Sequence, residues 1–155
     1  MEIVSTAVAV IVCRGEGPAT EILLMRRAKG FLRGEWCQVT GKIERDETGW
    51  QAAVREVREE TGVSEFDLYT AGYCDSFYNP EADRIEVLPI FVALFAADQI
   101  VKINHENTEC RWVRISEAEG ILPFVGHRIA LREVITDFVK RSPPGWRAIK
   151  HHTKG

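Results

Sequence analysis

Three glutamates stand close together in the sequence: Glu56, Glu59 and Glu60. If this stretch is a helix they share one side of it, because positions three and four apart are neighbours on a helix surface. Three carboxylates at that spacing repel one another in water. A divalent cation turns the repulsion into attraction, and Mg²⁺ and Mn²⁺ prefer hard oxygen ligands such as carboxylates, phosphates and water. The spacing therefore indicates a metal site, although a glutamate-rich helix face is more often simply solvated.

The residues around the glutamates predict the helix that positions them. Thr48 is a suitable N-cap, no proline interrupts the run from there to Thr61, and Gly62 is suited to end the helix as a C-cap. At about 100° per residue, a second side of this helix is apolar. Its members are Trp50, Ala53, Val54, Val57 and Thr61. We therefore expect a helix over residues 48–61 that gathers its apolar residues on one side and the glutamates on another.

The glutamates also belong to a longer pattern between Gly41 and Val63. It reads glycine, five residues, glutamate, seven residues, Arg-Glu, an aliphatic, one residue, Glu-Glu, one residue, glycine and an aliphatic. Seven of these positions demand one residue type each. At average usages of about 6–7% per type, the chance of a match per window is on the order of 10⁻⁸. The chain resembles the Nudix hydrolases, whose defining box has this spacing.

The resemblance implies a role for each polar residue of the box. In Nudix hydrolases the box binds divalent metals that hold a diphosphate, and water attacks one phosphorus. Carried over to this chain, Glu56, Glu59 and Glu60 are the metal ligands, and Glu59 or Glu60 also orients or deprotonates the water. Arg55, counted with the catalytic residues, forms an ion pair with Glu47 that aims the ligands. An ordinary surface pair is the alternative interpretation of these two residues.

Backbone geometry explains other positions of the box. Gly41 and Gly62 are expected to be needed for the course of the main chain. Many relatives have a further glycine where this chain has Asp46. Aspartate adopts the left-handed conformation at modest cost, so we expect the loop to keep its course.

Four residues are predicted to bind substrate. Arg27 precedes the box and Lys42 lies inside it, where a cation suits a phosphate. Trp36 and Tyr78 are suited to stack on a base or a pterin, although aromatic residues are more often part of the core or its rim. The segment WCQVTG at residues 36–41 resembles the Nudix subset that hydrolyses dATP and dihydroneopterin triphosphate.

A further carboxylate is expected from the segment before Trp112. Nudix relatives place a glutamate, often followed by histidine, about six residues before a tryptophan that opens the last strand. Glu106 matches that glutamate, and Asn107 stands where the histidine would be. The resemblance makes Glu106 a catalytic residue, as an additional metal ligand or as the base. The alternatives are an exposed loop glutamate without a role, or Glu109 as the extra carboxylate.

Composition narrows the class of protein. The chain has 155 residues, of which 45% are hydrophobic and 28% charged, which is ordinary for one globular domain. A formal net charge of −3 gives no general reason to expect nucleic acid or a membrane as partner. The four cysteines are widely spaced and form no CxxC pair, so reduced thiols and a cytoplasmic location are expected. They are Cys13, Cys37, Cys74 and Cys110.

Periodicity predicts strands interleaved with two main helices, and therefore an α+β or α/β domain. Strands are expected over residues 6–13, 21–27, 36–40, 68–77, 84–96 and 109–115. A helical turn capped by Ser116 and an amphipathic helix over Val125–Lys140 follow. The Nudix resemblance implies an α/β/α sandwich with a mixed sheet flanked by helices. We expect one domain over residues 1–142 and a basic C-terminal tail over residues 143–155.

These expectations combine into one predicted activity. The chain is expected to be a Mg²⁺-dependent pyrophosphohydrolase, with Mn²⁺ as a substitute, that converts a nucleoside or pterin triphosphate into monophosphate and pyrophosphate. One alternative is a dinucleoside polyphosphate hydrolase of the Ap4A type. Another is a catalytically silent Nudix domain that binds a ligand or regulates. The expected partner is a small triphosphate rather than nucleic acid, and a homodimer is left open because Nudix enzymes often dimerise.

Overall fold

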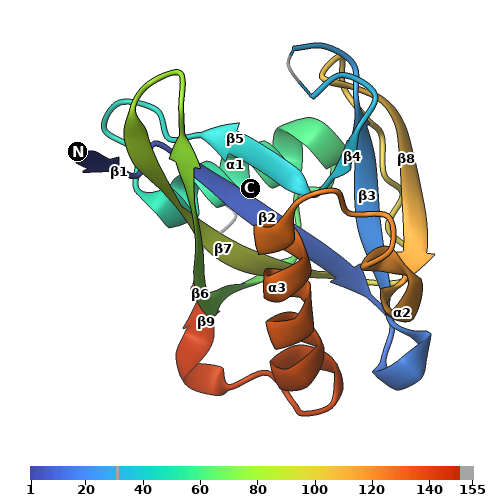
Figure 1. Cartoon of the computed structure of the whole chain (residues 1–155). Coiled ribbons are helices and arrows are strands. Elements are labelled where there is room, and N and C mark those ends of the chain that lie inside the picture. Colours follow the sequence, from blue (N-terminus) through green and yellow to red (C-terminus); the bar gives the residue numbers. More distant parts are fainter. Residues whose placement is uncertain (31, 151–155) are drawn as a thin grey trace.

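A single mixed sheet runs through the molecule, as the computed structural model shows for residues 1–30 and 32–150 (Figure 1). Its strands follow the order β4-β3-β2-β7-β6-β9, with β5 and β8 beside β2 and β3, and β1 beside β7. The strands are β1 (Glu2–Val4), β2 (Ala7–Arg14), β3 (Glu21–Arg27), β4 (Trp36–Cys37), β5 (Val39–Lys42), β6 (Asp67–Asn79), β7 (Arg84–Phe95), β8 (Asn107–Arg114) and β9 (Ala148–Ile149). Parallel pairing of β2 with β7 beside antiparallel pairs makes the sheet mixed, as predicted.

Helices cover both faces of this sheet. They are α1 (Gly49–Thr61), α2 (Ile115–Ala118) and α3 (Val125–Val134), the last continued by a π-helical turn at Ile135–Val139. Helix α1 packs on one face, and α2 and α3 pack on the other (Figure 1). The α/β/α architecture is therefore confirmed. No helix within residues 1–30 and 32–150 is long and apolar enough to cross a membrane.

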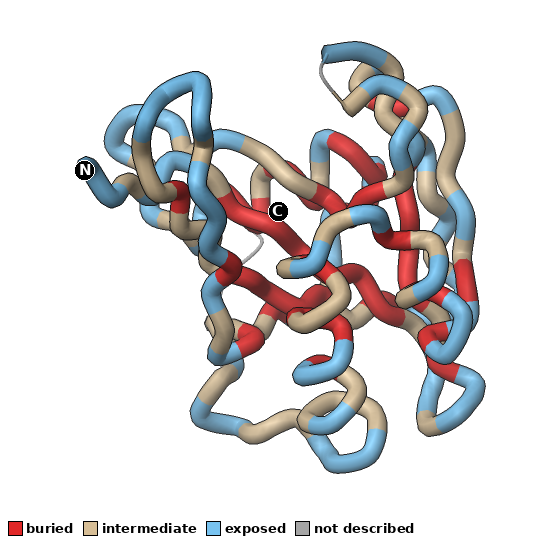
Figure 2. Tube along the Cα trace, viewed as in Figure 1, coloured by how far each residue is buried: buried red, intermediate tan, exposed pale blue. Residues whose placement is uncertain are grey.

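Strand β2 lies between two apolar layers, as the continuous buried segment in Figure 2 shows. Its side chains alternate between the faces. Val8, Val10 and Val12 join the layer under α1, whereas Ala9 and Ile11 join the layer under α3. Burial on both sides explains why this strand is apolar at nearly every position.

Several boundaries differ from the prediction, and three of these differences have an identifiable structural reason. The strand expected over residues 36–40 is divided at Gln38 into β4 and β5. Ser116 does not cap α2, because the helix begins at Ile115 directly after β8 and Arg114 occupies the cap position. Strand β8 begins at Asn107, two residues earlier than predicted, because the main chain opposite it pairs as far as Arg27.

The first part of the predicted basic C-terminal tail, as far as Ile149, contacts the sheet. Residues Ala148 and Ile149 form β9, which pairs with Tyr69 and Leu68 of β6. The guanidinium of Arg147 bonds to Asp137 at 2.5 Å and to the carbonyl of Ala71 at 3.2 Å. These contacts join residues far apart in sequence, so no local pattern reveals them. The remainder of the predicted tail, residues 151–155, lies outside the described residues.

Candidate active site

Helix α1 begins and ends where its capping residues predict. The Thr48 side chain accepts a hydrogen bond from the backbone N–H of Gln51, and the Gln51 side chain accepts one from the backbone of Thr48. At the other end Gly62 takes the left-handed conformation with φ 71°. Such reciprocal capping satisfies N–H groups that the first turn would otherwise leave unpaired. The helix is therefore fixed at both ends, and its glutamates are held in register with the sheet.

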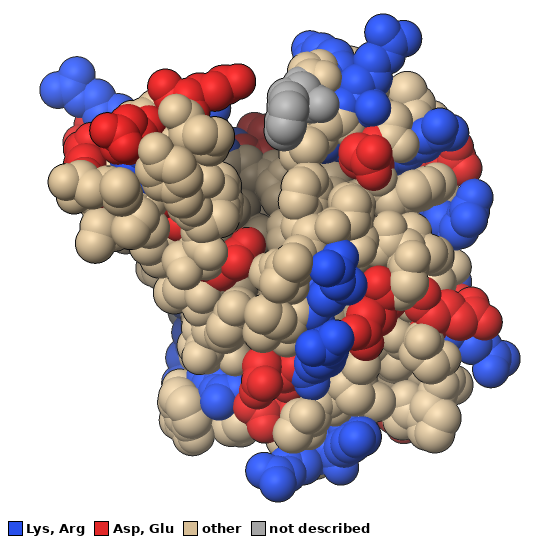
Figure 3. All heavy atoms as spheres, in the orientation of Figure 1, with Lys and Arg blue, Asp and Glu red and all other residues tan. Residues whose placement is uncertain are grey.

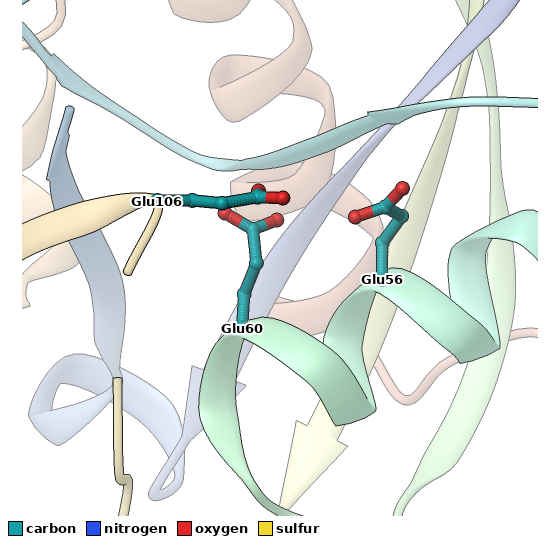
Figure 4. A group of neighbouring side chains, drawn as sticks. All are labelled: Glu56, Glu60 and Glu106. Atoms are coloured by element: carbon teal, nitrogen blue, oxygen red, sulfur yellow. The ribbon is translucent and has the colours of Figure 1, made fainter. Parts of the chain in front are cut away.

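Three carboxylates meet beside α1. Glu56, Glu60 and Glu106 each offer an oxygen atom, and these atoms lie within 4.8 Å of one another. Figure 4 shows Glu56 and Glu60 rising from the same side of α1, and Glu106 reaching toward them from the segment that leads into β8. Glu56 and Glu60 are only 6% and 2% exposed. We call these three residues the acidic trio.

Burial and mutual repulsion make the trio unfavourable without a counter-charge. Burial, together with the carboxylates of Glu106 and Glu56, raises the pKa of Glu60 to about 7, although the hydrogen bond from Asn107 opposes this shift. Burial also raises the pKa of Glu56, although Arg55 opposes that shift. Asn107 Nδ2 donates to Glu60 Oε1 at 2.9 Å, while Glu60 Oε2 is buried without a hydrogen-bond partner among the described residues.

This donor set fits a hard divalent cation. Carboxylate oxygens are the ligands that Mg²⁺ and Mn²⁺ prefer, and a buried oxygen with no partner is a coordination position without a competitor. Glu56, Glu60 and Glu106 are the residues that would hold the ion. Without a bound cation, the negative charges of the trio are costly, and such a cost is the expected property of a metal site.

Metal-free protein should gain stability from Glu60→Gln. The raised pKa of Glu60 means that its ionised form is disfavoured in the folded state. This cost grows as the pH rises above 4.5 and is complete above about 7, where it amounts to at most about 3 kcal/mol. In EDTA at pH 8 the variant should therefore melt at a higher temperature than the wild type, and at pH 4 the two should coincide. Equal melting temperatures at pH 8 would contradict the assigned strain.

Glu59, predicted as a metal ligand, is not part of the acidic trio. Its side chain is 50% exposed, and its Oε2 lies 3.4 Å from Arg55 Nη1. Its direction is about 60° from that of Glu56 and about 100° from that of Glu60, because consecutive residues are about 100° apart. Its role as ligand or base stays a prediction.

Arg55 connects the loop of the box to the acidic trio. Its Nε and Nη2 donate to Oε1 and Oε2 of Glu47 at 2.9 and 3.0 Å, the bidentate geometry that is strongest for this pair. Its Nη1 donates to Glu56 at 2.7 Å, and its Nη2 also donates to the carbonyl of Lys42 at 2.8 Å. Hydrogen bonds from Arg55 lower the pKa of Glu47. Arg55 and Glu47 thus form the predicted ion pair, which fixes the carboxyl group of Glu56.

Two residues of the box loop have a steric role. A Cβ atom at Gly41 would overlap the carboxyl group of Glu56, so only glycine leaves room for this ligand. Asp46 adopts the predicted left-handed conformation with φ 64°. Position 41 therefore requires glycine because Glu56 approaches closely, and not because of the course of the main chain as predicted. Position 62 does have the positive φ of a C-cap.

The two candidate carboxylates near β8 have different surroundings. Glu106 precedes the strand, and its backbone N–H donates to Asn104 Oδ1 at 3.0 Å while its side chain joins the trio. Glu109 lies within β8 and forms long ion pairs of 3.5 Å with Arg26 and Arg111. The structure therefore brings Glu106, and not Glu109, to the acidic residues of α1.

The four predicted substrate contacts are dispersed. Arg27 Nη1 donates to Thr40 Oγ1 at 3.2 Å, and its charge lowers the pKa of Glu60, so it lies beside the trio. Lys42 is exposed at the end of β5. Tyr78 is 52% exposed near the tip of the β6–β7 hairpin. Trp36 is half-buried with the guanidinium of Arg111 stacked 4.8 Å from its ring centre, so that ring is already in contact.

Asn107 is a site residue that the sequence did not predict. Asn107 holds Glu60 although 47 positions separate them. Its position directly after Glu106 was the available signal, because an amide there replaces the histidine of many relatives. A neutral donor is suited to fixing one carboxylate oxygen and leaving the other free.

Comparison with known proteins places these observations in a family context. A family model described as NUDIX domain matches residues 4–138 of the chain. An octanoyltransferase from Myxococcus xanthus is 33% identical over 123 residues, which are 78% of this chain and 34% of that protein. The chain spans between 17% and 43% of the length of the first four curated relatives it matches.

Solved structures share the fold. An Ap4A hydrolase from C. elegans has a TM-score of 0.72 at 20% identity, covering 86% of this chain and 96% of that one. The dihydroneopterin triphosphate pyrophosphohydrolase of E. coli has a TM-score of 0.69 at 19% identity, covering 83% and 94%. At such identities the likeness extends to the fold and not to the substrate.

Proposed function

Because the chain belongs to the NUDIX domain family, we propose that it is a Mg²⁺-dependent pyrophosphohydrolase of nucleoside or pterin triphosphates. The observation that carries the proposal is the acidic trio, held by Arg55 and Asn107 against a cost that a bound cation removes. Mn²⁺ is a suitable substitute because it prefers the same oxygen ligands. The WCQVTG segment at residues 36–41, which resembles one Nudix subset, supports the triphosphate class.

The site residues have distinct tasks in this reaction. When bound, the cation neutralises the phosphates and lowers the pKa of a coordinated water. Glu56 and Glu60 hold it from α1, and the Arg55–Glu47 pair keeps Glu56 aimed. Glu106 comes from a separate segment on the other side of the trio, where it is suited to orient the attacking water or take up its proton. Arg27, next to Glu60, is suited to contact a phosphate oxygen.

Product analysis tests this proposal. With Mg²⁺, a nucleoside triphosphate such as dATP or dGTP should yield the monophosphate and pyrophosphate, and EDTA should abolish the reaction reversibly. In ¹⁸O-labelled water, the label in one product identifies the phosphorus that is attacked. Orthophosphate as the first product would instead indicate a phosphatase and would contradict the proposal.

Hydrolysis of dinucleoside polyphosphates is the second candidate. It is the activity named for the Ap4A hydrolase of C. elegans, which shares the fold over 96% of that chain. The same metal site would serve either substrate, because both contain a phosphoanhydride. Diadenosine tetraphosphate assayed beside the triphosphates separates the two, since the better substrate has the higher kcat/KM.

A further inference from the structure

The surface is hollowed on the side of the sheet that α3 covers. Figure 3 shows this hollow between the β6–β7 hairpin at upper left and the loop joining β3 to β4 at upper right. Ala7 of β2 and Leu88 of β7 are only partly buried. Two residues further along these strands, Ala9 pairs with Ile90. Ala7 and Leu88 share the α3 face of the sheet with Ala9 and Ile90, and together they form an apolar floor on which a flat ring can lie.

Asp75 lies at the edge of this floor without a partner. It is 8% exposed, and its side chain has no hydrogen bond or ion pair with residues 1–30 or 32–150. It pairs through the backbone with Leu88, and its carboxyl group lies directly against Gly126 at the start of α3, where a Cβ atom would overlap it. The Asp75 oxygens keep some solvent contact and bind no donor among the described residues, so they are available to a ligand that carries N–H groups.

A second polar group without a partner lies beside it. His127 is 7% exposed, and its Nδ1 is buried with no hydrogen bond. Burial lowers the pKa of His127 more strongly than the nearby Asp75 raises it, so the ring is neutral and offers one donor and one acceptor. Phe77 follows Asp75 by two positions in the same strand, so it shares that face, and it is 48% exposed.

The strand register relates these groups to the acidic trio. Asp75 pairs with Leu88 in β7, β7 pairs with β2, and Ala7 of β2 pairs with Lys42 of β5. Three strand spacings of about 4.8 Å give about 14 Å from Asp75 to β5. Next to Lys42 is Gly41, against which Glu56 packs. The trio packs under α1 on the opposite face of the sheet, so β5 lies between it and this floor.

We infer that Asp75, Phe77 and His127 form a ring-binding subsite that selects heterocycles with two adjacent N–H donors. The 2-amino-4-oxo edge of a pterin and the matching edge of guanine have this pair. A carboxylate only accepts hydrogen bonds, so both N–H groups can bind Asp75 at once. Adenine presents a donor beside a ring acceptor, and the acceptor would oppose the carboxylate. The inference rests on the proposed function and narrows its substrate class.

The remaining contacts complete the subsite. The exposed face of Phe77 is suited to stack on the ring, and the neutral His127 ring lies beside Asp75. A site with buried polar groups rejects ligands that leave those groups unpaired more strongly than an apolar site rejects a change of size. The preference for guanine or pterin over adenine should therefore exceed what stacking alone provides.

Substrate analogues test the inference on the unaltered protein. We expect kcat/KM for dGTP and for dihydroneopterin triphosphate to exceed that for dATP at least tenfold. The analogue dITP lacks only the exocyclic amine of dGTP and should fall at least tenfold below it. Equal values for dGTP and dITP, or a preference for dATP, would overturn the inference.

The variant Asp75→Asn tests the same contact from the protein side. It should lower kcat/KM for dGTP at least tenfold, because the amide of asparagine is itself a donor and would face the N–H donors of guanine. It should change kcat/KM for dATP less than threefold, because adenine presents an acceptor beside its donor. Asp67→Asn, at an exposed aspartate of the same strand, is the matched control and should change neither. Equal losses on both substrates would show a structural role and overturn the assignment.

Phe77→Ala should weaken the binding of all substrates alike, and unchanged binding would remove Phe77 from the subsite.

Binding without turnover separates the subsite from the proposed reaction. In EDTA, calorimetry with dGMP and dAMP reports ring recognition alone, and dGMP should bind at least tenfold more tightly. Such a preference in a protein that hydrolyses no triphosphate would support the subsite and contradict the proposed function. Hydrolysis with equal binding of the two monophosphates would overturn the subsite and leave the proposed function standing.

Discussion

Replacing Glu60 by glutamine should lower Mg²⁺-dependent turnover at least a hundredfold and leave the fold intact. Glu60 combines the deepest burial in the acidic trio with an oxygen atom that accepts no hydrogen bond from residues 1–30 or 32–150. Glutamine retains the shape and can still accept the hydrogen bond from Asn107, but it removes the charge that attracts the cation. Loss of a carboxylate ligand weakens both metal binding and the charge neutralisation on which phosphoryl chemistry depends.

The measurement is turnover as a function of Mg²⁺ concentration, with circular dichroism to confirm the fold. Glu65→Gln is a suitable control, because Glu65 is exposed beyond the end of α1. Wild-type turnover in Glu60→Gln would remove Glu60 from the site. Glu59→Gln in the same series decides whether Glu59, which lies outside the trio, is a ligand in the working enzyme: a loss comparable to that of Glu60→Gln would show that it is.

Local signals made much of the site predictable. Thr48 and Gly62 cap α1 through contacts within a few residues, and Asp46 takes the left-handed conformation that its side chain tolerates. The direction of Glu56 and Glu60 follows from helical periodicity alone. The mixed sheet between helices followed from the family pattern. These features depend on short-range geometry that a sequence pattern encodes directly.

Other features depend on contacts between distant segments. Asn107 meets Glu60 across 47 positions, and β9 pairs with β6 across nearly 80. The reason for Gly41 is likewise a contact with Glu56 from another element rather than its own conformation. Helical spacing placed Glu59 with the other glutamates, but its rotation about the axis and its contact with Arg55 direct it away from them. Spacing determines which residues are neighbours on one helix but not which of them a loop elsewhere will meet.

The choice between Glu106 and Glu109 shows how the structure resolves such an ambiguity. Three residues separate the two, and the sequence alone left open where the strand begins. Strand β8 begins at Asn107, so Glu106 remains in the preceding segment and reaches the trio (Figure 4). Within β8, Val113 faces the layer under α3, while Trp112 packs on the layer under α1. Glu109 is held on the surface between Arg26 and Arg111.

Glu106→Gln should therefore lower turnover at least tenfold, whereas Glu109→Gln should stay within a few-fold of the wild type. Both variants remove one carboxylate and keep its shape, so each is the matched control for the other. The assay varies both the Mg²⁺ concentration and the pH, which separates a weakened metal site from a lost proton acceptor. If Glu106 is the base, its variant also changes the pH dependence of turnover, because the group whose ionisation limits the rate is gone. If it is only a ligand, higher Mg²⁺ restores part of the activity and the pH profile keeps its shape. The reverse ranking of the two variants would show that the carboxylate beside α1 in the folded chain is not the one the reaction uses.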